Sequence, residues 1–394
     1  MKPLEGITIL DLSRVLAAPF ATMILAELGA RVIKVEQPGV GDEIRYYEPI
    51  YKGRSAYFFS ANRSKESVTM NLRNPKAADI VQLLAAKADV VVENFTVGTL
   101  ARYGLDYDSL SKVNPGLVYV SVTGFGQTGP YAKRRGYDTV FQAMTGMVSL
   151  TGEQGGAPCK AGLPVADLSS GLWAAIAILS GVLGRKSSGK GAYIDFSMFD
   201  GQVSLLTIAA ARYFALGEVP QRMGTEHLGR VPSAAFECGD GGWVQITCND
   251  QHWAPLCRLL GITEWGLDAR IAENAGRLEH RDEVMDRLRA EIRKWERDAL
   301  VDACIAEKVP CGPVLDVEEV IHDRHVSERG LVTEFDHPEV GKFPGLSLPF
   351  KFSGFDPAGF ERPPLLGEHT DSVLHEMLGL SEEEIGKLRE EGAI

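Results

Sequence analysis

The carboxylate whose setting best suits a role in catalysis is Asp167, in the stretch Gly162–Gly171 directly before a long apolar segment. Small and apolar neighbours leave room for a bulky substrate to reach it. A carboxylate that is held in place and partly desolvated can attack an acyl group. An aspartate at a helix start can also cap the helix, accepting backbone N–H groups. The local sequence favours the cap, and a role as nucleophile is compatible with it.

A set of basic residues forms a second candidate for chemistry. Each follows a predicted strand or lies in a neighbouring loop, and ligands of open α/β sheets bind at the carboxyl ends of strands. Against a net charge of −12, such a set would attract a ligand with several phosphates. Scattered solvated charges are the alternative. The residues are Arg14, Arg73, Arg102, Lys133, Arg134 and Arg135.

Other motifs give weaker signals. Residues 124–129 match G-x-G-x-x-G, but the polar run 130–135 follows where a dinucleotide site needs an apolar helix. Residues 184–190 have P-loop spacing, yet Gly191 replaces the magnesium-binding Ser or Thr. The eight histidines show no metal-type spacing. We therefore predict no metal site and no permanently bound cofactor.

The elements that must position these residues alternate between strand and helix. Strands that are almost wholly Val, Ile and Leu are typical of a parallel sheet covered on both faces. We predict a doubly wound, Rossmann-like α/β large domain. The strands are expected at 7–10, 31–35, 89–92, 117–122 and 192–196, with helices at 19–28, 76–87 and after Asp167.

The pattern breaks near residue 216. Beyond it we expect a smaller α+β domain, with a strand at 243–246 and helices near 252–260, 281–294 and 300–308. A Pro- and Gly-rich return segment follows, ending in a helix at 381–391. The predicted domains are 1–215 (first part of the large domain), 216–330 (small domain) and 331–394 (completing the large domain).

Composition narrows the class of protein. The 394 residues are 45% hydrophobic and 24% charged, as in ordinary soluble domains, and the net acidity disfavours a nucleic-acid partner. Six cysteines without a C-x-x-C pair indicate free thiols in a reducing compartment. The N-terminus has no signal-like apolar segment, and the 17-residue uncharged stretch 168–184 indicates a core helix more than a membrane span. We expect a cytoplasmic protein with no membrane partner.

Taken together, the motifs resemble class III coenzyme A transferases, the family of the formyl-CoA:oxalate and carnitine CoA-transferases. The resemblance runs from about residue 4 to 379. It rests on Leu4–Gly6, Asp11–Val15 with Ala18-Pro19, Leu28–Pro38, Gly41-Asp42, Asn62–Lys65, Val92–Phe95, Gly124–Pro130, Asp167, Pro310–Val314 and Leu366–Thr370.

The resemblance implies a catalytic role for Asp167, in its Asp-x-x-x-Gly context. The carboxylate would form an aspartyl anhydride with the donor acyl group and then an aspartyl-CoA thioester, from which CoA passes to a free carboxylic acid. Small dicarboxylates are the implied acids, with larger acids such as carnitine or an aromatic acid left open, and acyl-CoA is the implied CoA donor. The resemblance also implies an interlocked homodimer. The resemblance further implies which residues bind CoA and which two face the substrate. The CoA-binding residues would be Val15, Leu16, Ala17, Arg73, Asn94, Phe95, Arg102 and Arg135, and the substrate-facing residues would be Tyr137 and Asp138.

Two other functions stay open at this point. Acyl-CoA racemases of the same fold carry a histidine in a Gly-His-Asp sequence, whereas this chain has Gly136-Tyr137-Asp138. A tyrosine, with an ordinary pKa near ~10, is poorly matched to removing an α-proton at neutral pH. A non-catalytic acyl-CoA-binding protein is the second alternative, and the presence of Asp167 disfavours it.

Overall fold

The computed structural model describes residues 2–355 and 359–394, which form two compact units. The first unit contains residues 1–147, 160–211 and 324–394, and the second contains 148–159 and 212–323. Its boundaries thus fall at 211/212 and 323/324, close to the 215/216 and 330/331 expected from the sequence. The short segment 148–159 joins the second unit instead of the first.

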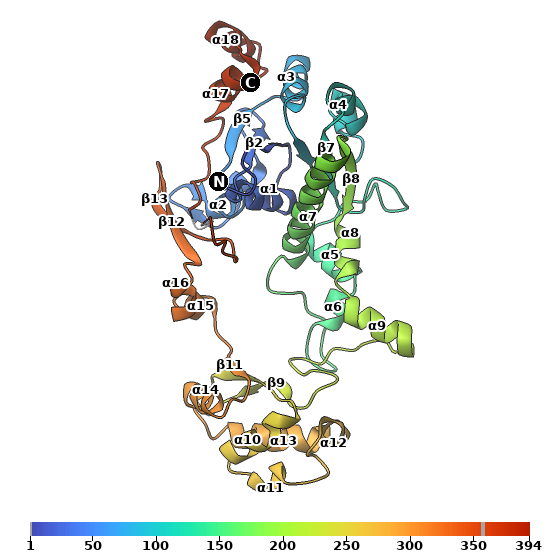
Figure 1. Cartoon of the computed structure of the whole chain (residues 1–394), viewed down its shortest axis with the longest axis vertical. Coiled ribbons are helices and arrows are strands. Elements are labelled where there is room, and N and C mark those ends of the chain that lie inside the picture. The colour runs from blue at the N-terminus through green and yellow to red at the C-terminus, as the bar shows by residue number, and fades with distance from the viewer. Residues whose placement is uncertain (1, 356–358) are drawn as a thin grey trace. The chain divides into compact units, whose positions relative to one another are not determined.

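A six-stranded, all-parallel sheet forms the centre of the first unit (Figure 1). Counted among the six strands of this sheet, the third in chain order lies at one edge and the sixth at the other, as in doubly wound folds. The prediction of an α/β fold with a parallel sheet is confirmed. The order is β5 (Glu66–Thr69), β2 (Arg31–Glu36), β1 (Thr8–Asp11), β6 (Val90–Glu93), β7 (Val118–Thr123) and β8 (Ala192–Ser197).

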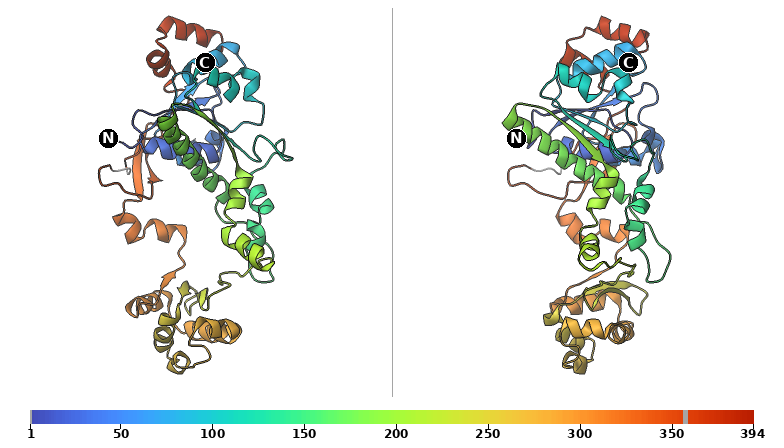
Figure 2. Two further views of the ribbon diagram at one scale, coloured as in Figure 1. Left: turned by 45° about the vertical axis from the view of Figure 1, so that its right-hand side comes forward. Right: turned by 90° about the vertical axis from the view of Figure 1, so that its right-hand side faces the viewer.

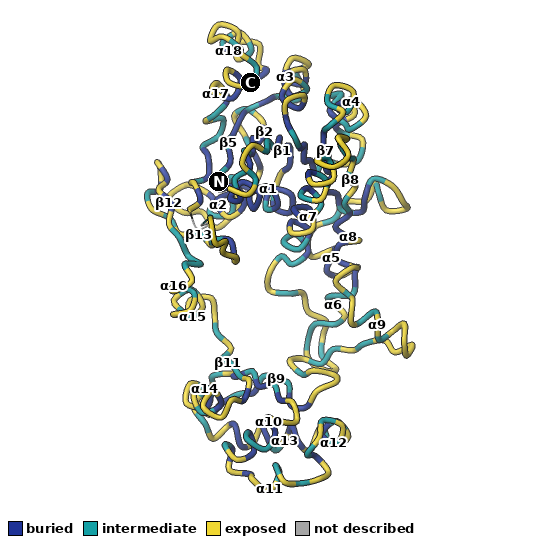
Figure 3. The backbone as a smooth tube through the Cα atoms, in the orientation of Figure 1, coloured by how far each residue is buried: buried dark blue, intermediate teal, exposed yellow. Residues whose placement is uncertain are grey.

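Helices cover both faces of this sheet, because alternate residues of each strand point to opposite sides. Leu10 and Val91 face the layer of α3 (Pro75–Ala85), α4 (Tyr107–Val113), α17 (Thr370–Leu378) and α18 (Glu382–Glu390). Ile9 and Val90 face α1 (Ala17–Glu27) and α7 (Val165–Ser188). Figure 2 shows the two layers on either side of the strands. The strands between them are largely buried, except the edge strand β8, which is partly exposed (Figure 3).

Helix α7 is long and apolar enough to cross a membrane by length and composition. In this fold, however, Ala174, Ile178 and Val182 pack in the core against the sheet. Gly171 lies so close to α1 that an added Cβ would stand 2.7 Å from the carbonyl oxygen of Ala17. The helix therefore acts as a core element that fixes the start of α1.

The remaining elements of the first unit lie at its edges. They are η1 (Glu43–Tyr46), β3 (Ile50–Tyr51), β4 (Arg54–Ser55), α2 (Ala56–Asn62), η2 (Leu100–Tyr103), α5 (Asp138–Met144), α8 (Met198–Ser204), α16 (Arg324–Glu328) and the hairpin β12 (Val332–His337) and β13 (Gly341–Leu346). Helices α6 (Met147–Leu150) and α9 (Thr207–Leu216) cross the unit boundaries.

The second unit contains a three-stranded antiparallel sheet packed with helices around its own core. The sheet consists of β11 (Cys311–Pro313), β10 (Trp243–Thr247) and β9 (Ser233–Glu237). The helices are α10 (Asp250–Leu259), α11 (Thr263–Gly266), α12 (Asn274–Glu279), α13 (Arg281–Ile292), α14 (Arg297–Ala306) and α15 (Val317–Ile321).

Candidate functional site

Two loops meet where the strand order of the first unit reverses, between β1 and β6. Loop 12–16 leads from β1 to α1, and loop 94–99 leaves β6. Open α/β sheets bind ligands at this switch point, outside the carboxyl ends of the strands. A cavity of about 440 Å³ opens here, lined by both loops, by residues 132 and 134–138 and by Asp167.

Asp167 lies in the first turn of α7 but does not cap the helix, so the N-cap prediction is wrong. The N-cap residue is Pro164, which has no side chain that could accept a hydrogen bond. Asp138 takes over this task from α5. Its Oδ1 accepts the backbone N–H groups of Ala166 (2.8 Å) and Asp167 (3.2 Å), and its Oδ2 accepts a hydrogen bond from Gln142 Nε2 (2.6 Å). The carboxylate of Asp167 is thereby left available to a ligand in the cavity.

Burial, reinforced by the negative charge of Asp138, raises the pKa of Asp167 to about 7. An acid with this pKa is about half ionised at neutral pH, and its carboxylate is a stronger base than that of an ordinary aspartate. Burial and the charges of Asp167 and Asp138 likewise raise the pKa of Tyr57 to about 12. The Tyr57 phenol therefore stays protonated beside these two carboxyl groups.

These pKa shifts predict how activity depends on pH. The resemblance implies that the ionised Asp167 attacks acyl-CoA, and on that expectation kcat/KM should rise with pH through a midpoint near the pKa of about 7. Asp138→Asn removes a neighbouring negative charge, which lowers the pKa of Asp167, so the midpoint should move to lower pH. Asp79→Asn on the exposed side of α3 is the matched control and should leave the profile unchanged. An unshifted profile for Asp138→Asn would contradict this assignment.

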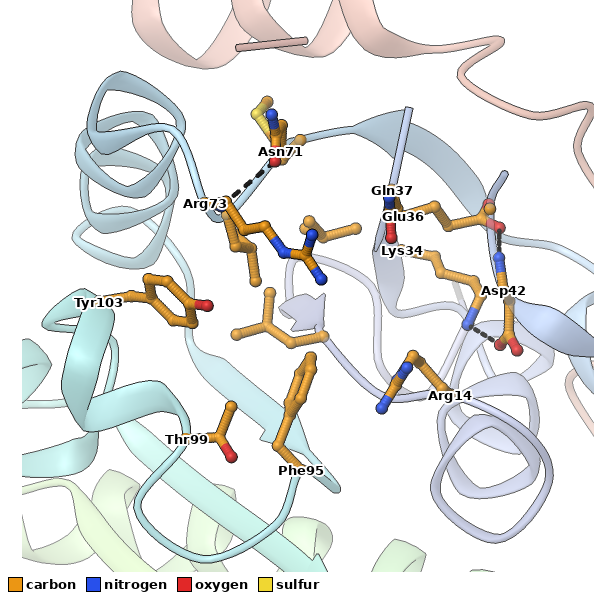
Figure 4. A pocket seen from close by; sticks show the side chains of 15 residues that line it. Arg14, Lys34, Glu36, Gln37, Asp42, Asn71, Arg73, Phe95, Thr99 and Tyr103 are labelled. Atoms are coloured by element: carbon orange, nitrogen blue, oxygen red, sulfur yellow. Dashed lines mark hydrogen bonds and ion pairs between the residues drawn. The ribbon is translucent and has the colours of Figure 1, made fainter. Parts of the chain in front are cut away.

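A second cavity, of about 200 Å³, lies beside the first and shares Arg14 and Phe95 with it. Figure 4 shows Arg73 reaching into it from the loop after β5, and Arg14 approaching from the loop after β1. The Arg14 guanidinium lies 4.9 Å from the centre of the Phe95 ring. Two arginines and an aromatic face are suited to a phosphorylated, aromatic ligand.

The structure brings together most of the side chains singled out in the sequence. Arg73 lines the smaller cavity and Phe95 lines both. Arg102 lies exposed on η2 and lines neither of the two. The larger cavity is lined by Val15, Leu16, Ala17, Asn94, Phe95, Arg135, Tyr137, Asp138 and Asp167.

Sequence reasoning missed several residues of the larger cavity. Thr123, Phe141 and Met198 line it, and the buried hydroxyl oxygen of Thr123 has no hydrogen-bond partner in the described chain. Tyr57 was also missed, because a tyrosine within the apolar helix α2 looks like a packing residue. Arg14 was noticed only as one of a basic set, although it borders both cavities.

Within residues 2–355 and 359–394, no cluster of three or more His, Cys, Asp or Glu side chains is placed to hold a metal ion. The six cysteines are all free thiols.

Known proteins resemble this chain along its whole length. It is 41% identical to a mouse succinyl-CoA:glutarate CoA-transferase, with all of this chain and 91% of the relative aligned. A succinate–glutarate CoA-transferase from Agrobacterium fabrum is 40% identical, over 95% of this chain and 96% of its own.

The fold gives the same result. The crystal structure of a CAIB/BAIF family protein from Brucella suis superimposes with a TM-score of 0.85 at 40% identity, covering 95% of this chain and 99% of the other. The family model of CoA-transferase family III matches residues 4–370. The chain therefore belongs to CoA-transferase family III and is a CoA-transferase.

Proposed function

We propose that this enzyme moves CoA between small dicarboxylic acids, with Asp167 as the covalent carrier. The observation that carries the proposal is the placement of Asp167. It is a partly buried carboxyl group with a pKa of about 7, and it lines the larger cavity. This cavity shares Arg14 and Phe95 with the smaller cavity, which is also lined by Arg73. The relatives that act on succinyl-CoA and glutarate support this class of acids.

The two cavities suggest how acyl-CoA lies. The nucleotide end takes the smaller cavity, where Arg73 and Arg14 pair with its phosphates. Gln37, in the same cavity, is uncharged and contributes only hydrogen bonds. The pantetheine arm then follows residues 15–17 to place the thioester at Asp167.

The reaction follows from this placement in four acyl transfers. The Asp167 carboxylate attacks the thioester carbonyl, giving a mixed anhydride and CoA thiolate. The thiolate attacks the aspartyl carbonyl, releasing the donor acid and leaving an aspartyl-CoA thioester. The acceptor carboxylate displaces CoA from the aspartate, forming a second anhydride. The thiolate finally attacks the acceptor carbonyl, releasing the new acyl-CoA and free Asp167.

We further propose that the enzyme works as an interlocked homodimer in the cytoplasm. Helix α7 leaves apolar side chains uncovered in the single chain: Leu172, Ile176 and Leu183 are 52%, 51% and 69% exposed. A second copy would remove this apolar surface from water. The six free thiols suit a reducing compartment.

The proposal is tested by trapping the carrier. Enzyme mixed with succinyl-CoA and glutarate, quenched during turnover and digested, should show CoA or acyl adducts on the peptide containing Asp167 by mass spectrometry. A panel of other acyl-CoA donors and acids defines the range of substrates. Absence of any adduct, with kinetics that require direct transfer in a ternary complex, would refute the covalent route.

The racemase alternative is tested by a separate measurement. A chiral 2-methylacyl-CoA incubated with the enzyme in deuterated water should show no exchange of its α-proton, because Tyr137 stands in place of the histidine base and its side chain is 80% exposed. Rapid exchange would revive that alternative.

A further inference from the structure

The turn that joins β1 to α1 has an unfavourable backbone conformation. Val15 has a φ of +68°, in the left-handed region that β-branched residues avoid because it is strained for them. Such a conformation persists only where neighbouring groups hold it. The turn lies at the junction of the two cavities, because Arg14 lines both of them and Val15 lines the larger.

The side chain of Asn94 holds one end of this turn. Its Oδ1 accepts the backbone N–H of Arg14 at 2.9 Å, and its Nδ2 donates to the carbonyl oxygen of Arg14 at 2.7 Å. The amide thus pairs with both polar groups of one residue, as a neighbouring strand would. Asn94 is itself fixed, because it directly follows β6 in the sheet.

A buried ion pair holds the other end. Both oxygens of Asp42 accept the N–H of Val15 at 3.2 Å. Lys34 Nζ lies 2.8 Å from Asp42 Oδ2 and also donates to the carbonyl oxygen of Ser13 at 2.9 Å, with both charged side chains fully buried. From Ser13 to Val15, the turn is therefore fixed by side chains from three other elements.

We infer that Asn94 is a positioning residue, which together with Asp42 holds the Arg14–Val15 turn in its left-handed form before acyl-CoA arrives. The resemblance to known transferases implied that Asn94 contacts the CoA nucleotide, but both polar atoms of its amide are engaged by Arg14. A turn already ordered saves the entropy that binding would otherwise lose, which strengthens ground-state and transition-state binding equally. The inference rests on the proposed function for the identity of the ligand, CoA.

The test combines Asn94→Ala with Val15→Gly. Asn94→Ala should raise the Kd of CoA and the KM of acyl-CoA about tenfold, with kcat within about threefold, as expected for a loss of uniform binding. Glycine adopts positive φ without strain. In the Val15→Gly background, the Asn94→Ala effect on Kd should therefore fall to about threefold or less, as coupled sites show in a double-mutant cycle. An equal effect in both backgrounds would mean that Asn94 acts by contacting CoA, and would overturn the inference.

Hydrogen exchange gives a readout that needs no ligand. The amide of Arg14 should exchange at least about tenfold faster in Asn94→Ala, because its acceptor is lost. Asn114→Ala is the matched control: Asn114 Nδ2 also donates to two backbone carbonyl oxygens, those of Ala85 and Ala88, but away from the turn. It should lower the melting temperature without changing CoA affinity or Arg14 exchange. Unchanged Arg14 exchange in Asn94→Ala would refute the inference that Asn94 holds the turn. Failure of the parent enzyme to bind CoA would refute the proposed function alone.

Discussion

Asp167→Asn is expected to reduce CoA exchange between succinyl-CoA and glutarate by at least about 10³-fold, the usual scale for loss of a covalent nucleophile. The amide has nearly the same shape as the carboxyl group, so the cavity should keep its form. It cannot attack a thioester, however, and no covalent adduct can form at this position. Steady-state rates and mass spectrometry of the quenched protein measure the two effects.

The same variant should be more stable than the parent protein at neutral pH and above. The pKa of Asp167 in the folded chain, about 7, lies above its ordinary value of 3.8. Its contribution to stability is therefore complete below pH 3.8 and is lost as the pH rises through the interval up to about 7. Asp167→Asn does not titrate, so the variant should gain stability relative to the parent over this interval and keep the gain above it.

Near-normal turnover by Asp167→Asn would contradict the first prediction and remove Asp167 from the mechanism.

Gly171→Ala is expected to destabilise the protein by about 1–3 kcal/mol, the range found when a methyl group is forced into a packed core. Its Cβ would stand 2.7 Å from the carbonyl oxygen of Ala17 and 2.8 Å from Cδ1 of Phe20. Helices α1 and α7 must then separate, and this shifts Asp167 relative to residues 15–17 on the cavity wall. We therefore expect a lower melting temperature together with a higher KM for acyl-CoA.

Gly184→Ala is the matched control for this effect. Gly184 belongs to the same helix, but nothing lies within 4 Å of the position that its Cβ would take. Alanine is the better helix former, so this variant should gain up to about 1 kcal/mol. If both variants changed stability equally, close packing at Gly171 would not be the cause.

The elements best predicted from the sequence are strands that are buried on both faces of the sheet. The run Val90-Val91-Val92 is apolar on both faces, which favours a parallel sheet covered by helices on each side, and it forms the buried strand β6. The hairpin β12–β13 was not predicted, because Pro344 and the glycines 341 and 345 read as a loop. Edge β5 was missed because it is short and half polar.

The candidate site was predictable only in part, for a related reason. The chemistry of Asp167 could be proposed from its setting and from the resemblance, because both depend on neighbours in the chain. Its actual environment depends on Asp138, 29 residues earlier, and the turn at Arg14 depends on Asn94, 80 residues away. Hydrogen bonds between such distant residues leave no periodic signal in the sequence.

The packing of the last helices bears on how this protein is made. Val373, Leu374 and Ile385 complete the core that faces α3, although the strands beneath them lie between residues 8 and 197. On the ribosome, the side of the sheet that α3 and α4 cover stays incompletely covered until these residues emerge, while the continuous stretch 212–323 is already free to fold. The second unit should thus fold first during translation, and the first unit, which carries Asp167, should be the last to become resistant to proteases.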